Sequence, residues 1–341
     1  MTAEPTVTVA GAGALGLVTA LALADAGWRV TLADPSGANA SGVAAGMLAP
    51  AFEAVLDDSA RPHFEVLLAA RNLWPALEAR AGVRLDRAGA LGVGPASWLA
   101  EVADGFASLG LRAAELPRAA AEALTGGLPS DAAALLTRED WRLSPAQALG
   151  ALRAAAQDAG VELRTDEVRE RGEADWLVIA TGASTTLAQV APELAALTPI
   201  KGHILRLPDA APPAMTIRGP GVYIAPANGG VAVGATMEAG VGDPVVDPAQ
   251  GPPLLAAAAR VTPRLTGAAY ELQAGVRGAT PDGLPLAGLS RTPRVAIAAG
   301  ARRNGWLLAP LVARAVVAQL TGAEPGPFAA RLDPRRFGPE G

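Results

Sequence analysis

Three glycines near the start of the chain have the spacing of a site that binds a dinucleotide. Gly11, Gly13 and Gly16 follow an apolar run at residues 7–10 and precede an Ala/Leu-rich stretch. In such a turn the first glycine permits a tight bend, the second lets a pyrophosphate approach the backbone, and the third lets the helix pack closely on the strand. The N–H groups at the start of that helix then attract the phosphates.

An acidic residue stands where a second strand is expected to end. Asp34 follows the strand pattern at 29–33 and lies 18 residues beyond Gly16. This is close to the spacing of the acid that binds a ribose hydroxyl in dinucleotide sites. A glycine turn in an ordinary α/β protein is the alternative. Strand, helix, second strand and acid in this order favour the dinucleotide site.

Small residues dominate the stretch after Asp34. A loop is expected at 35–41, and bulky side chains are absent from there until Met47. Such a segment can lie against a flat ring or a phosphate, and a flexible turn is the alternative. His63 precedes a helical pattern and is expected to cap that helix or to lie on the surface.

The composition excludes several other chemistries. The chain has no cysteine and two histidines, so we predict no disulfide, no thiolate chemistry and no metal site. A net charge of −5 without a basic run argues against nucleic acid or an anionic membrane as the main partner. The start of the sequence lacks a signal-peptide pattern, and no apolar run reaches about 18 residues, which predicts a cytoplasmic protein.

The elements that must hold these residues follow two kinds of pattern, and 341 residues suffice for two domains. Helical patterns cover 17–26, 64–79, most of 95–124, 144–159 and 306–320. Buried strands are expected at 7–10, 29–33, 175–180 and 295–299, and weaker strand character at 82–93. Strand patterns at 201–207, 222–226 and 231–236 indicate a mostly antiparallel sheet. Pro/Gly-rich connections are expected at 243–253 and 324–327.

Five further patches match a known family in the family's order. They are residues 41–50 (SGVAAGMLAP), 223–226 (YIAP), 233–237 (VGATM), 275–283 (GVRGATPDG) and 303–310 (RNGWLLAP). Together with the glycine-rich start, they make nearly the whole chain resemble the D-amino-acid-oxidase-like FAD oxidoreductases. Within that family, the chain most resembles the ThiO/glycine oxidase group of thiamine biosynthesis.

The resemblance implies an α/β fold of the p-hydroxybenzoate-hydroxylase type with an α+β substrate domain. The FAD-binding, Rossmann-like domain would be discontinuous, with residues 1–82, 138–199 and 284–341. The substrate domain would be interleaved with it, built on an antiparallel sheet, and would take residues 83–137 and 200–283.

The resemblance also implies which residues hold a noncovalently bound FAD. Its phosphates would lie at the glycine-rich turn, its ribose at Asp34, and its flavin beside the start of the last long helix. That helix N-terminus would stabilise negative charge on the reduced ring. The implied contacts are Gly11, Gly13, Ala14, Leu15, Gly16, Asp34, Pro35, Ala40, Ser41, Ala45, Gly46, Met47, Val168, Gly182, Ala301, Arg302, Arg303, Asn304, Gly305, Trp306 and Leu307.

By the same resemblance, the reaction is the oxidation of a small amino acid or amine, with glycine as the leading candidate. The imine would hydrolyse to an oxo acid and ammonia, and oxygen would be reduced to hydrogen peroxide. Arg277 would bind the substrate carboxylate through its planar fork, and Tyr223 and Arg303 would also contact the substrate. The ordinary alternatives are a surface ion pair for Arg277, cross-strand packing for Tyr223 and a solvated turn for Arg303.

Two positions depart from the family pattern. In the turn at 300–305 (GARRNG), Arg302 replaces an aromatic residue, and Ala227 replaces the usual basic residue after the YIAP patch. No general base is assigned, because His203 lies in a segment, KGHI, that matches a structural part of the substrate sheet. Three alternatives stay open: an FAD-dependent dehydrogenase with another electron acceptor, an NAD-dependent enzyme, and a flavin-binding protein without turnover. Homo-oligomers are compatible with all of them.

Overall fold

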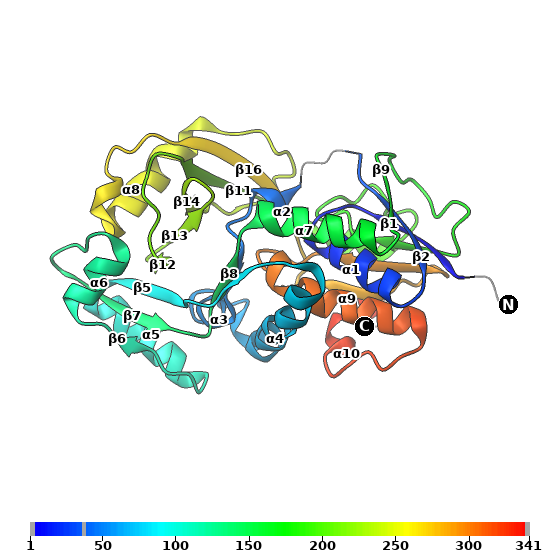
Figure 1. The fold of residues 1–341 in the computed structure, drawn as a ribbon, viewed down its shortest axis with the longest axis horizontal. Helices are drawn as coiled ribbons and strands as arrows, with labels where there is room; N and C mark the ends of the chain where they lie inside the picture. The colour runs from blue at the N-terminus through cyan, green and yellow to red at the C-terminus, as the bar shows by residue number, and fades with distance from the viewer. Residues whose placement is uncertain (1–3, 36–38, 338–341) are drawn as a thin grey trace.

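The structure is a computed structural model that describes residues 4–35 and 39–337. Over these ranges the chain extends along one axis, with a large β-sheet toward each end and helices packed against both (Figure 1). Segments distant in sequence pair within each sheet, so the chain passes between the sheets several times. The two interleaved domains and their boundaries stay a prediction.

The first sheet, here called the parallel sheet, contains the strand that precedes the glycine-rich turn. Its strands lie in the order β17-β18-β10-β1-β2-β9, and every neighbouring pair is parallel except β17 and β18. Their bounds are β1 (Thr6–Ala10), β2 (Arg29–Ala33), β9 (Glu162–Arg164), β10 (Trp176–Ile179), β17 (Leu286–Leu289) and β18 (Val295–Ala299). The four buried strands that the sequence predicts are therefore confirmed.

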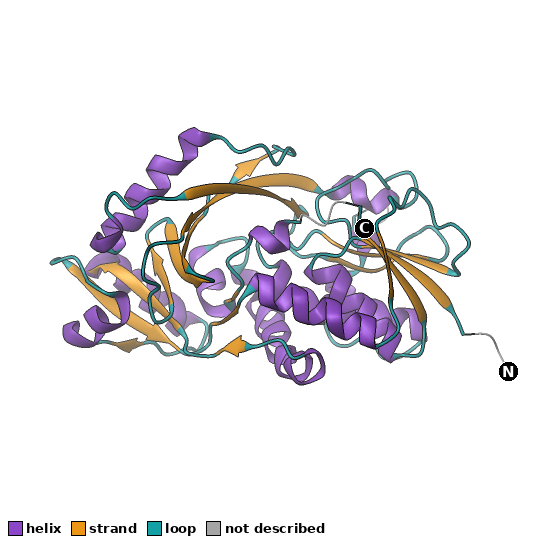
Figure 2. Cartoon of the chain, turned by 45° about the horizontal axis from the view of Figure 1, so that its top comes forward, coloured by secondary structure: helices purple, strands orange, loops and turns teal. Residues whose placement is uncertain are grey.

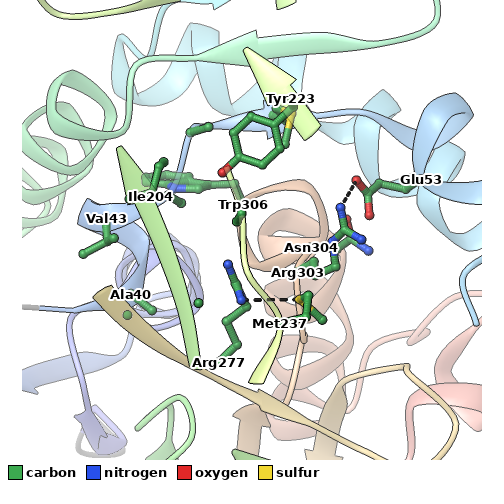
Figure 3. A pocket seen from close by; sticks show the side chains of 17 residues that line it. Ala40, Val43, Glu53, Ile204, Tyr223, Met237, Arg277, Arg303, Asn304 and Trp306 are labelled. Atoms are coloured by element: carbon green, nitrogen blue, oxygen red, sulfur yellow. Dashed lines mark hydrogen bonds and ion pairs between the residues drawn. The ribbon is translucent and has the colours of Figure 1, made fainter. Parts of the chain in front are cut away.

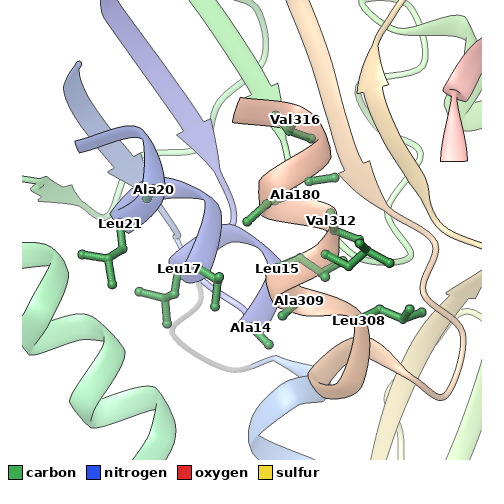
Figure 4. Packing of buried hydrophobic residues seen from close by; sticks show 14 of the residues in the cluster. Ala14, Leu15, Leu17, Ala20, Leu21, Ala180, Leu308, Ala309, Val312 and Val316 are labelled. Atoms are coloured by element: carbon green, nitrogen blue, oxygen red, sulfur yellow. The ribbon is translucent and has the colours of Figure 1, made fainter. Parts of the chain in front are cut away.

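Both faces of the parallel sheet are buried, as is usual for parallel strands. On one face, Val178 belongs to the same hydrophobic cluster as α1 (Ala14–Asp25) and α9 (Gly305–Thr321). On the other face, Ile179 packs with leucines from residues 187–197. Figure 4 shows α1 and α9 packed together through small and branched side chains near their first turns. This packing brings the N-termini of the two helices toward one place.

The second sheet, here called the antiparallel sheet, has the strand order β15-β11-β14-β13-β12-β5-β7-β6, and β16 pairs along the other edge of β11. Within this sheet, as far as the structure describes it, β12 and β5 are the one parallel pair. Their bounds are β5 (Ala90–Pro95), β6 (Ala114–Glu115), β7 (Ala132–Thr137), β11 (Thr198–Leu207), β12 (Thr216–Gly219), β13 (Val222–Ala227), β14 (Gly230–Gly234), β15 (Glu238–Ala239) and β16 (Glu271–Ala279). Figure 2 shows β11 and β16 as an arch that reaches toward the parallel sheet.

The remaining elements connect and cover the two sheets. A small sheet has the order β3 (Met47–Leu48), β8 (Trp141–Leu143) and β4 (Leu85–Asp86). The other α-helices are α2 (Ala40–Val43), α3 (Pro50–Leu56), α4 (Phe64–Ala81), α5 (Ala96–Ser108), α6 (Arg118–Thr125), α7 (Pro145–Asp158), α8 (Gly251–Val261) and α10 (Ala329–Leu332). In the part of the chain that the structure describes, no helix combines the length and apolar character needed to cross a bilayer.

The structure differs from the sequence-based expectations in several details. Helix α8 begins inside the connection expected at 243–253, because proline is well tolerated in the first turn of a helix. Strand β16 was not expected, since its glycines mask the strand pattern. Residues 40–41 were expected in a loop but belong to α2, where the Asn39 side chain accepts a hydrogen bond from the Gly42 N–H. Residues 36–38 of that expected loop lie outside the described residues.

Candidate active site

The turn between β1 and α1 has the geometry that its glycine spacing predicts. Gly11 has a φ of 103°, and a Cβ there would lie 2.5 Å from the carbonyl oxygen of Ala180. A Cβ at Gly16 would lie 1.8 Å from the Gly11 carbonyl oxygen, so helix and strand meet closely. Gly13 is the N-cap of α1, makes no side-chain cap, and is followed by no acidic residue in the first turn. The start of α1 can therefore accept a phosphate.

Ser41 joins this turn to two other elements. Its hydroxyl accepts a hydrogen bond from the Ala14 N–H at 3.0 Å. Its carbonyl accepts one from the Trp306 indole N–H, also at 3.0 Å. The first turns of α1 and α9 therefore meet at α2. Predicted FAD contacts from the glycine-rich turn, from α2 and from the start of α9 come together here, although they are far apart in sequence.

Several other predicted FAD contacts lie outside the lining of the cavity described below. Ala301, Arg302, Gly305 and Leu307 flank its lining residues in sequence, and four more lie in other segments. Asp34 follows β2 and donates its N–H to the Arg164 carbonyl at 3.0 Å. Pro35 is exposed beside it, and Gly182 has a φ of 68° in the turn after β10. Val168 packs against the cluster under the second face of the parallel sheet.

A cavity lies between α2, the start of α9 and the antiparallel sheet (Figure 3). It contains predicted FAD contacts and all three predicted substrate contacts. Its lining residues are Ala40, Val43, Ala44, Ala45, Gly46, Met47, Glu53, Gly202, Ile204, Tyr223, Ala235, Met237, Gly275, Arg277, Arg303, Asn304 and Trp306.

Arg277 and Tyr223 reach the cavity across glycines of neighbouring strands. A Cβ at Gly202 of β11 would lie 2.2 Å from a terminal nitrogen of Arg277 on β16. A Cβ at Gly234 of β14 would lie 2.2 Å from the Tyr223 hydroxyl on β13. The sheet therefore leaves room for both large side chains on its cavity face, and Figure 3 shows them directed into the same space.

Arg277 is a partly buried cation with weak partners. Its Nη1 lies 3.4 Å from the Thr236 carbonyl oxygen and 3.5 Å from the Met237 sulfur. No carboxylate among the described residues pairs with it. Burial lowers the pKa of the Arg277 guanidinium from its ordinary value, but an arginine stays charged near neutral pH. The side chain can therefore take an anion from the cavity.

Tyr223 places a hydroxyl beside this guanidinium. The residue is 8% exposed, and within the described ranges its hydroxyl has no hydrogen-bond partner. Burial raises the pKa of the Tyr223 phenol, so the hydroxyl keeps its proton near neutral pH. It can donate that proton in a hydrogen bond to an anion held by Arg277.

Arg303 has the opposite surroundings. Its Nη2 lies 3.3 Å from Glu53 Oε1, and its Nη1 lies 3.5 Å from Asp57 Oδ2. The charge of Glu53 raises the pKa of the Arg303 guanidinium. Arg302 also pairs with Asp57 and donates its N–H to the Gly278 carbonyl, so its side chain faces that acid.

A buried ionic cluster beside the cavity was missed from the sequence. Arg218 of β12 brings both terminal nitrogens within 3.1 Å of Glu53 Oε1, and both side chains are 4% exposed. Burial raises the pKa of Glu53, but the guanidinium groups of Arg303 and Arg218 outweigh it and hold that pKa below its ordinary value. Asp140 accepts the N–H groups of the first turn of α3, and burial raises its pKa to about 7.

The two histidines lie apart from the cavity lining. His63 stands at the N-cap of α4 but makes no side-chain cap there, so the capping expectation is wrong. Its ring instead contacts the Asp282 carbonyl at 2.8 Å and the Arg331 guanidinium at 2.6 Å. His203 is fully buried on the other face of β11, where its ring contacts Glu238 and Asp247.

The sequence profile of one protein family, described as FAD dependent oxidoreductase, matches residues 6–319. The chain belongs to this family, the D-amino-acid-oxidase family. It is therefore an FAD-dependent oxidoreductase, with a Rossmann-like FAD-binding fold joined to an antiparallel sheet. Because the family uses FAD, the alternative of an NAD-dependent enzyme is excluded.

Individual relatives lie in the group that the sequence patches indicate. A putative thiamine biosynthesis oxidoreductase ThiO of Rhizobium etli is 33% identical, over 92% of this chain and 96% of that protein. A bifunctional ThiO/ThiG protein of Trichormus variabilis is 30% identical over 97% of this chain, which spans 55% of that relative. The chain thus spans about half the length of such bifunctional relatives. The crystal structure of glycine oxidase from Geobacillus kaustophilus superposes with a TM-score of 0.83, at 27% identity over 97% of this chain and 98% of that one.

Proposed function

We propose that this protein oxidises a small amino acid, glycine first among the candidates, to an imine that water converts to an oxo acid and ammonia. Oxygen is the final electron acceptor and is reduced to hydrogen peroxide. The observation that carries the proposal is Arg277, a partly buried guanidinium that faces the cavity and has no carboxylate partner among the described residues. The names of the ThiO relatives support a role in making the thiazole of thiamine.

The protein's own side chains bind and orient the substrate in this proposal. Arg277 binds both carboxylate oxygens through its fork, and Tyr223 donates a further hydrogen bond to one of them. Arg303 forms part of the cavity wall, since its charge is already shared with Glu53 and Asp57. The positions of Arg277 on β16 and of Tyr223 on β13, with β11 and β14 between them, fix which end of the amino acid points toward the sheet.

The described residues fit the FAD that the family requires. The open start of α1 and the glycines around it would hold the phosphates, with Ser41 beside them. Ala45, Gly46 and Met47 and the first turn of α9 would hold the ring. When bound, FAD supplies the two-electron acceptor for the oxidation of the carbon–nitrogen bond. A helix N-terminus beside that ring favours added negative charge.

The deciding experiment uses the purified, FAD-loaded protein. Under anaerobic conditions, glycine, sarcosine and D-alanine are added in turn, and bleaching of the flavin absorbance is followed. Under air, hydrogen peroxide, ammonia and the oxo acid are measured. Bleaching with peroxide in amounts equal to the oxo acid supports the proposal. Bleaching without peroxide identifies a dehydrogenase with another acceptor. Absence of bleaching with all three compounds contradicts the proposed function.

A further inference from the structure

We propose that His203 is a positioning residue for carboxylate binding, although its side chain lies on the face of β11 turned away from the cavity. It acts through residues 236–247, called the strap here, which follow β14 and pass over β11. The inference rests on the proposed function in one respect, because it takes Arg277 as the group that binds the substrate carboxylate.

Alternate side chains of β11 point to opposite faces of the sheet, so the residues that line the cavity differ from those that bind the strap. Gly202 and Ile204 line the cavity. Because successive residues of a strand point to opposite faces, Lys201 and His203 lie on the other side of the sheet. Both are buried there, and both bind the strap. The strand that supports the Arg277 guanidinium at Gly202 is therefore also the strand that holds the strap.

His203 contacts the strap through two backbone and three ring hydrogen bonds. Its carbonyl accepts the Thr236 N–H at 3.3 Å, and its Nδ1 lies 3.2 Å from the Thr236 hydroxyl. Its backbone N–H donates to the Thr236 hydroxyl at 2.8 Å. Its Nε2 accepts the N–H of Asp247 at 2.9 Å, and its Nδ1 lies 2.9 Å from Glu238 Oε1. A backbone N–H can only donate, so Nε2 is the acceptor and Nδ1 carries the proton that Glu238 receives. One neutral ring thus ties both ends of the strap to β11.

The start of the strap touches Arg277. The Thr236 carbonyl and the Met237 sulfur lie 3.4 and 3.5 Å from Arg277 Nη1. On its other side the guanidinium lies against Gly202. These contacts are the only hydrogen bonds of the Arg277 side chain within the described ranges. Thr236 therefore links the two residues directly, with its hydroxyl toward His203 and its carbonyl toward Arg277.

Loss of the His203 ring should loosen Arg277 without removing it. The pairing of β15 with β11, the Lys201–Asp243 ion pair and the backbone bonds between residues 203 and 236 would remain, so the strap would loosen without leaving β11. The hydrogen bonds of Arg277 are long and neutral, so a looser strap would let the guanidinium sample more rotamers, and binding would have to restrict them again. This cost falls equally on the bound substrate and on the transition state. We therefore expect a higher KM at nearly constant kcat.

Three substitutions of His203 separate its two ring contacts. His203→Ala removes both, His203→Asn keeps an amide donor near Glu238, and His203→Gln keeps an acceptor near the Asp247 N–H. For His203→Ala we expect KM for the amino acid and the calorimetric Kd for acetate to rise about tenfold each, with kcat within about twofold. Each amide variant should recover part of the acetate affinity. FAD content and Tm are measured throughout, and the amide variants carry the test if the alanine variant does not fold.

A double variant with Arg277→Ala distinguishes a positioning role of His203 from a general loss of structure. If His203 acts through Arg277, adding His203→Ala to Arg277→Ala should change the acetate Kd by less than about twofold, because interacting residues are not additive. The same rise in both backgrounds, or an unchanged Kd in the His203 variants, overturns the inference. Acetate binding needs no turnover, so a wild-type protein that binds acetate but oxidises no amino acid would contradict the proposed function and leave this test valid.

Discussion

Two arginines line the same cavity in opposite electrostatic surroundings. Arg303 lies between Glu53 and Asp57, and the charge of Glu53 raises its pKa. Arg277 has a carbonyl and a thioether for partners, and burial lowers its pKa. A buried charge costs free energy unless it is paired, so the pairing of Arg303 belongs to the folded protein itself. The missing partner of Arg277 is the one that an anionic substrate can supply.

The largest expected effect comes from Arg277→Ala. A carboxylate bound in a cavity by a guanidinium loses about 2–5 kcal/mol of binding free energy when the guanidinium is removed, so KM should rise on the order of a hundredfold or more. FAD content and Tm should stay close to those of the wild type, since no described carboxylate loses a partner. Steady-state kinetics with glycine measure this, and Arg112→Ala, at an exposed position, is the control. An unchanged KM would remove Arg277 from the proposed role.

Arg303→Ala should act on stability instead. It leaves Glu53 with one arginine and Asp57 with Arg302, so we expect a loss of about 3 kcal/mol in the free energy of unfolding. Urea unfolding of the FAD-loaded protein measures it, and Glu53→Gln in the same background should restore part of the loss. Normal stability combined with a KM as high as that of Arg277→Ala would reverse the roles of the two arginines.

The pH dependence of stability provides a second test of the pairing between Glu53 and its two arginines. The guanidinium groups hold the pKa of Glu53 below its ordinary value of 4.5, against the effect of burial. A carboxyl whose pKa is lower in the folded state stabilises the fold above that ordinary value, and the contribution is lost as the pH falls below it. The stability difference between wild type and Glu53→Gln should therefore shrink between about pH 5 and pH 3. A difference that stays constant over this range would contradict the pairing.

Gly202→Ala should disturb Arg277 while keeping it in place. The new Cβ would lie 2.2 Å from a guanidinium nitrogen, so the end of this flexible side chain must move. Overpacking of this kind costs about 1–3 kcal/mol, which corresponds to a rise of about tenfold in KM. Gly150→Ala on α7 is the matched control, because a Cβ there would have no atom within 4 Å. Equal kinetics for the two alanine variants would argue against a fixed guanidinium position.

The two arginines also show which features of the fold and the site could be predicted from the sequence. The glycine turn and the strands of the parallel sheet follow from local patterns, and the structure has them where the patterns predict them. Arg277 and Tyr223 came from short patches, and the sheet brings them together. The pair of Glu53 and Arg218 gave no such signal, because 165 residues separate its members and its burial depends on the assembled sheet. The carboxylates that pair with Arg303 were missed for the same reason.

Tyr223→Phe should have the smallest effect of this series. Phenylalanine keeps the ring against Gly234, and within the described residues the hydroxyl has no partner to lose, so stability should not change. One hydrogen bond to the substrate is lost, while Arg277 still binds the carboxylate. The loss of that hydrogen bond costs about 1 kcal/mol of binding free energy, or a rise of about fivefold in KM. Kinetics and acetate binding by both variants provide the measurement. If Tyr223→Phe raised KM as much as Arg277→Ala does, the hydroxyl and the guanidinium would bind the carboxylate as one unit. Carboxylate binding would then distinguish the pair of Arg277 and Tyr223, and not Arg277 alone, from Arg303.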